Sequence, residues 1–154
     1  MNNVLLMFAI VALATAAEAN LGQTPQEIEA RYGKPSGDAT VEVPATGAKT
    51  YQKNGLQITV QFWKDQSCKE RYAKDPSNVM SDKEIFDLIN ANSSTSGIAW
   101  GGTIRKSGTT IAYERGDKKA WALATPADGW IEVFTSEWNQ EKNRLKYEAD
   151  KGKQ

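Results

Sequence analysis

The chain contains no histidine, one cysteine and 19 acidic side chains, and these counts limit the chemistry that it can perform. Without an imidazole, a Ser–His–Asp triad, a Cys–His pair and a histidine-ligated metal site are all excluded. No EF-hand spacing and no glycine-rich phosphate loop occurs, so we expect neither a metal nor a cofactor. A pair of carboxylates acting as acid and base is the catalytic route that the sequence leaves open.

The single cysteine, Cys68, has two interpretations. It is either a free thiol for catalysis or intermolecular pairing, or a half-buried residue of a strand. Lys69 follows it directly and would point to the opposite face of that strand, where it cannot activate the thiol. We favour the structural interpretation, because free cysteines are among the most buried residues in proteins.

Tryptophan is unusually frequent, with five in 154 residues. One interpretation is an exposed aromatic platform for a glycan, a peptide or a protein partner. The other is that the rings fill the core of a small sheet, and we expect this for most of them. Trp63 and Trp130 are the predicted exceptions, because each alternates away from apolar neighbours on its strand.

Composition and charge narrow the classes of partner. Lys and Arg number 19, equal to Asp and Glu, so no net field would attract nucleic acid or an anionic membrane. The apolar fraction of 40% and the charged fraction of 25% are ordinary for a soluble globular protein. We therefore expect no nucleic-acid partner.

Residues 1–19 form an expected signal peptide. An apolar run from Val4 to Ala14 is followed by Ala17 and Ala19, which predicts cleavage after Ala19. The run is shorter than the roughly 20 residues that a membrane span needs. We thus expect a secreted or periplasmic protein with no stable membrane anchor after cleavage.

Two short helices are predicted from their first residues. Thr24 and Glu27 form a capping box, and Gly33 lies where a left-handed C-cap would end the helix. Ser81 and Glu84 form a second capping box before an apolar helical pattern. Each short helix needs a surface on which to dock, because an isolated helix of this length is unstable in water.

Strands are predicted between the helices and after them. Asn54-Gly55 indicates a tight hairpin, and the alternation that follows predicts a strand ending at Trp63. The polar run 67–74 is a third strand, expected near the sheet margin, and 41–43 is an expected edge strand. After the second helix, strands are expected at 98–105, 109–114, 120–125 and 130–134, followed by a polar C-terminal helix.

These patterns predict an α+β fold with two tandem units, each a helix followed by an antiparallel β-meander. The expected divisions are a signal peptide at 1–19, a first unit at 20–78, a second unit at 79–135, and the C-terminal helix and tail at 136–154. A single continuous sheet with helices on one face is the alternative.

The first helix and its hairpin resemble the SmpA/OmlA and beta-lactamase-inhibitor-like group of small exported domains. The resemblance covers about the first third of the mature chain and rests on Gly22, Thr24, Glu27, Ile28, Tyr32, Gly33, Pro35, Asn54 and Gly55. It implies a helical element packed on an antiparallel sheet, sometimes in two tandem units, and a binding role. The lipid-anchoring cysteine of the outer-membrane members is absent.

We therefore expect an exported, non-enzymatic module that binds a protein of the cell envelope or the extracellular space. Trp63 and Trp130 are the candidate partner-binding residues. The alternative is a small carboxylate-based hydrolase, or a glycan- or peptide-binding protein that uses exposed tryptophans. A third possibility is an envelope component defined by its oligomerisation.

Overall fold

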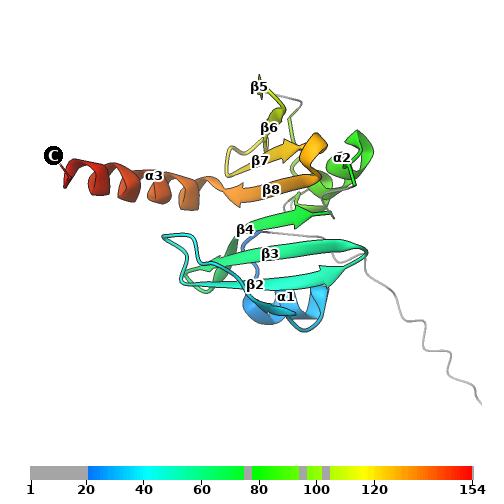
Figure 1. The fold of residues 1–154 in the computed structure, drawn as a ribbon, viewed down its shortest axis with the longest axis horizontal. Coiled ribbons are helices and arrows are strands. Elements are labelled where there is room, and N and C mark those ends of the chain that lie inside the picture. Colours follow the sequence, from blue (N-terminus) through cyan, green and yellow to red (C-terminus); the bar gives the residue numbers. More distant parts are fainter. Residues whose placement is uncertain (1–20, 75–77, 94–96, 102–104, 154) are drawn as a thin grey trace, which may run out of the picture.

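The computed structural model describes residues 21–74, 78–93, 97–101 and 105–153. The expected signal peptide at 1–19 lies outside the described residues. The described chain is an α+β fold with one antiparallel sheet and a C-terminal helix (Figure 1), as the sequence predicts.

Eight strands form the sheet in the order β1-β2-β3-β4-β8-β7-β6-β5. Every neighbouring pair is antiparallel. The strands are β1 (Gly37–Asp38), β2 (Gly47–Lys53), β3 (Leu56–Trp63), β4 (Gln66–Ala73), β5 (Arg105–Ser107), β6 (Thr110–Glu114), β7 (Ala120–Thr125) and β8 (Trp130–Thr135). The helices are α1 (Pro25–Tyr32), α2 (Asp82–Ala91) and α3 (Ser136–Lys151), with a short 3-10 turn at Pro126–Asp128.

The predicted starts of α1 and α2 are confirmed. The Thr24 hydroxyl accepts a hydrogen bond from the Glu27 amide, and the Ser81 hydroxyl accepts one from the Glu84 amide. In both boxes the glutamate side chain accepts from the backbone of the capping residue in return. The hairpin between β2 and β3 also forms as predicted, with positive φ angles at Asn54 and Gly55.

Helices α1 and α2 pack on the same face of the sheet. Ile28 of α1 and Ile85 and Ile89 of α2 belong to one buried cluster. The sheet residues of that cluster include the cross-strand row Tyr51, Ile58, Tyr72, Ile131 and Ala124. The two helices thus complete one hydrophobic core that extends across β2, β3, β4, β8 and β7.

The opposite face is covered only at one end. Trp138 in the first turns of α3 is buried against Phe134, Cys68 and Ala45. Beyond this contact α3 projects away from the sheet (Figure 1). Among the described residues, no helix lies over the rest of this second face.

Three predicted strand positions are wrong. The segment 67–74 is not marginal, because β4 lies in the middle of the sheet between β3 and β8. Its polar side chains are accommodated there by ion pairs, including those of Lys69 and Glu70. Residues 41–43 form no strand, and 98–101 contribute only an isolated bridge at Trp100, while β5 starts at Arg105.

Candidate functional site

The candidate site is the part of the sheet that no helix of the described chain covers. Because side chains of directly paired residues point to the same face, the register identifies this surface. Thr59, Arg71, Glu132 and Leu123 form one cross-strand row, and Trp130 begins the next row. We call this surface the open face and define it by the half-buried residues Thr50, Thr59, Arg71, Leu123, Trp130 and Glu132.

Arg71 and Trp130 form the centre of the open face. The Arg71 guanidinium lies over the Trp130 ring, with its Cζ atom 4.6 Å from the ring centroid. Arg71 Nη1 also donates to Glu132 Oε1 at 3.1 Å, which fixes the orientation of the guanidinium plane. The Arg71 side chain keeps 42% of its surface exposed, so an ordered cation on an aromatic ring faces the solvent.

Ion pairs connect the open face to α3. Lys69 is buried and contacts both Glu132, at 3.0 Å, and Glu42, at 2.7 Å. Lys142 of α3 contacts the same Glu42 at 2.7 Å. Burial alone would raise the pKa of Glu42, but hydrogen bonds from Lys142 and Lys69 outweigh it and lower that pKa. The α3 end of the open face is thereby bounded by a fixed chain of alternating charges.

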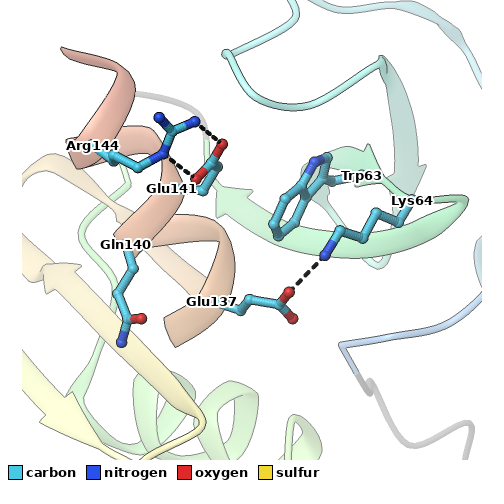
Figure 2. A pocket seen from close by; sticks show the side chains of 6 residues that line it. All are labelled: Trp63, Lys64, Glu137, Gln140, Glu141 and Arg144. Atoms are coloured by element: carbon cyan, nitrogen blue, oxygen red, sulfur yellow. Dashed lines mark hydrogen bonds and ion pairs between the residues drawn. The ribbon is translucent and has the colours of Figure 1, made fainter. Parts of the chain in front are cut away.

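Trp63 lies in a different hollow, of about 460 Å³, between the β3–β4 turn and α3 (Figure 2). The Lys64 ammonium is 4.1 Å from the centroid of its ring and 2.7 Å from Glu137 Oε1. Figure 2 shows the indole between Lys64 and the side chains of α3. The hollow is lined by Trp63, Lys64, Glu137, Gln140, Glu141 and Arg144.

The structure does not bring the two predicted tryptophans together. Trp63 pairs with Gln66 at the turn end of β3, whereas Trp130 pairs with Ala73 at the opposite end of β4. Both rings are half-buried, and the other three tryptophans are half-buried or buried. Arg71 and Glu132 were not predicted as site residues. Alternation places Glu132 on the same face of β8 as Trp130, but no local signal pairs β8 with β4 and so brings Arg71 beside them.

One buried carboxylate lies under the helices on the other face. Glu70 has no exposed surface and accepts hydrogen bonds from the Tyr32 hydroxyl at 2.7 Å and the Tyr72 hydroxyl at 2.5 Å. Arg31 Nη1 is 3.4 Å from its other oxygen. Burial raises the pKa of both tyrosine hydroxyls, and the negative charge of Glu70 is the second largest cause. A carboxylate enclosed in this way meets no solvent and so has no route to a substrate.

Cys68 is more deeply buried than the half-buried position that we expected. Its thiol donates to the Gln61 carbonyl at 3.3 Å, and burial raises its pKa to about 12. A thiol with that pKa stays protonated at neutral pH and is a poor nucleophile.

Within the described ranges, no group of three or more acidic or cysteine side chains is arranged to hold a metal ion. No helix of the described chain is both long enough and apolar enough to cross a membrane. Comparison with models of protein families, with curated proteins and with solved structures finds no match.

Proposed function

We propose that this chain is an exported, non-enzymatic binding module whose open face contacts a protein of the cell envelope or the extracellular space. The observation that carries the proposal is Arg71 on Trp130 in a half-buried surface without a covering helix. Arginine and tryptophan dominate the binding energy of protein interfaces, since they combine large apolar area with directed hydrogen bonds.

The charge pattern of the open face fits the same proposal. Glu132 accepts from Arg71 and contacts Lys69, so these charges already have partners before any complex forms. A prearranged surface loses less conformational entropy on binding than a mobile one. Leu123 packs against the cluster that contains Trp138, and its half-buried side chain adds apolar surface at the α3 end of the open face.

We also propose that the chain consists of two tandem units, each a helix followed by a four-stranded meander. The strand order supports this, because β1 to β4 and β8 to β5 run in mirrored sequence from the central β4–β8 pair. The two capping boxes, at Thr24 and Ser81, open the two units in the same way. Export through a signal peptide at 1–19 remains part of the proposal.

The test is affinity capture from the exported fraction of the source cells, with quantified recovery of each bound protein. We expect a partner that the unmodified chain captures and that Trp130→Ala and Arg71→Ala lose at least about tenfold, as for interface hot spots. Phe86→Ala is the matched control, because Phe86 is an aromatic residue with 60% exposure on α2, on the other face. Equal recovery by Trp130→Ala and the unmodified chain would refute the role of the open face.

The second candidate function is binding of a glycan or peptide in the hollow beside Trp63. The carboxylates of Glu137 and Glu141 and the Arg144 guanidinium surround that hollow and offer hydrogen bonds next to an aromatic ring. A shift of tryptophan emission with a glycan or peptide, abolished by Trp63→Leu and retained by Trp130→Leu, would favour it. Turnover of such a ligand would favour the hydrolase alternative.

A further inference from the structure

A small cavity of about 170 Å³ lies between α1, α2 and the β2–β3 hairpin. It is separate from the open face, because the helices pack on the other side of the sheet. Nine residues line it, which are Arg31, Tyr32, Lys53, Asn54, Leu56, Ile58, Tyr72, Leu88 and Ala91. One part of its wall is thus aliphatic and another is polar and cationic.

Arg31, in the polar part of the wall, is a buried cation with one unsatisfied donor. Arg31 is only 6% exposed, and its Nη1 atom donates to Tyr32 and Glu70. Its Nη2 atom has no hydrogen-bond partner among the described residues. This atom has almost no accessible surface, so a ligand in the cavity does not reach it, and Arg31 acts on the cavity through its charge.

Lys53 gives the cavity an excess positive charge. Its ammonium group donates to the Arg31 carbonyl at the end of α1 and lies 5.9 Å from the centroid of the Tyr32 ring. No carboxylate of the described residues forms an ion pair with it, whereas Arg31 is paired with Glu70. The three charges therefore sum to one net positive charge beside the cavity, which suits a single anionic group.

Size and lining define the rest of the ligand. The cavity is well below the roughly 300–1,000 Å³ of pockets for drug-sized molecules, so its occupant is small. Leu56, Ile58 and Leu88 offer an apolar surface to a short hydrocarbon chain. The anionic end would lie at Lys53, and the chain would lie along the aliphatic wall.

We propose that this cavity binds a small organic monocarboxylate with a short apolar chain. The carboxylate accepts from Lys53 Nζ, and the chain packs against Leu56, Ile58 and Leu88. This site is independent of the proposed protein-binding function, since it lies on the face that carries α1 and α2.

The test is titration of the isotope-labelled purified protein with hexanoate, followed by amide shifts in two-dimensional NMR spectra. We expect saturable shifts confined to the cavity wall, at the end of α1 (31–32), in the hairpin (53–58) and at the end of α2 (88–91). The uncharged isostere 1-hexanol should bind at least tenfold more weakly, because it cannot form the ion pair. Equal affinity for hexanol, or shifts that do not saturate, would overturn the proposal.

Two lysines of the same strand provide a matched pair of variants. Lys53→Met keeps the aliphatic stem and should weaken hexanoate binding at least tenfold. Lys49→Met should leave it unchanged, because Lys49 pairs with Asp38 at the surface and does not line the cavity. Equal weakening by both variants would mean that only general surface charge attracts the probe, and the site would be rejected.

Filling the cavity gives a second, independent readout. Ala91→Leu adds three carbons to the aliphatic wall and should abolish the hexanoate-induced shifts at 53–56 while leaving the helical circular-dichroism signal intact. Undiminished hexanoate binding by a folded Ala91→Leu protein would overturn the proposal. If that variant fails to fold, the comparison of Lys53→Met with Lys49→Met by itself tests whether hexanoate binds in the cavity.

Discussion

Glu70 is a fully buried charge in the middle of the sheet, and its three hydrogen-bonding neighbours determine what it contributes. Removal of a carboxylate from water is costly, and here two tyrosine hydroxyls and one guanidinium replace the lost hydration. The Asn92 amide extends the cluster by donating to Tyr72 at 3.1 Å. The cluster joins α1, β4 and the end of α2, so its geometry fixes how both helices sit on the sheet.

Loss of the carboxylate alone should therefore destabilise the protein strongly. We predict that Glu70→Ala lowers the free energy of unfolding by about 3–5 kcal/mol, because it leaves Arg31 as an uncompensated buried charge. Urea denaturation followed by circular dichroism measures the change. The double variant Arg31→Met with Glu70→Leu should lose less, since it removes both charges. A loss with Glu70→Ala that is no larger than that of the double variant would contradict this account.

At the scale of elements, local chemistry could be predicted and long-range pairing could not. The starts of α1 and α2 depend on residues three positions apart, such as Thr24 and Glu27, so the sequence alone identifies them. The central position of β4 depends on its pairing with β8, some sixty residues later in the chain, as in Arg71 with Glu132. No local pattern specifies that pairing, and the polar composition of β4 favoured the wrong position.

The features of the candidate site also fall into two groups, those that depend on one strand and those that depend on pairing between strands. Alternation within one strand predicted Trp63 and Trp130 as the exposed exceptions, but both are half-buried, as are Trp100 and Trp121. The stacking of Arg71 on Trp130 requires two strands from different halves of the chain to be neighbours, so it became visible only in the structure. The buried environment of Cys68 likewise depends on Phe134 and Trp138, which are distant in sequence.

The end of α1 supplies a test at this scale. Gly33 has φ 88° and ψ −170°, which is outside the left-handed helical region that we expected but is equally restricted to glycine. We predict that Gly33→Val lowers the free energy of unfolding by about 1–3 kcal/mol through backbone strain. An added Cβ would meet nothing within 4 Å at this position, so a steric clash would not contribute to the loss of stability.

Gly37→Val is the matched control for that measurement. Gly37 is also exposed and also has open space for a Cβ, but its φ is not positive. Valine should be tolerated there, because β-branched residues suit a strand. Chemical denaturation of both variants compares them, and equal stability of the two would remove backbone conformation as the reason for a glycine at 33.

At the scale of the whole molecule, the two halves share one core. Ile28, Tyr51 and Tyr72 from the first half lie in the same buried cluster as Ile85, Ile89 and Ile131 from the second. The β4–β8 pair also joins the halves by direct strand pairing. Neither half can bury its apolar surface without the other, whether or not the two units arose by duplication.

We predict from this shared core that the protein unfolds in one cooperative transition. Tryptophan fluorescence reports chiefly on the second half, because Trp100, Trp121, Trp130 and Trp138 all lie there, while far-UV circular dichroism reports on both halves. The two signals should give the same urea midpoint and the same slope. Separate midpoints would indicate that the halves unfold independently and would contradict a common core.

The lengths of the outermost strands limit how another chain can associate with this sheet. β1 has two residues and β5 has three, whereas β3 and β4 at the interior have eight each. Short edge strands present few free backbone groups, which is a common protection against edge-to-edge aggregation. An added strand would find little backbone to extend here. The proposed binding would therefore depend on side chains of the sheet faces, which a partner would contact without adding a strand.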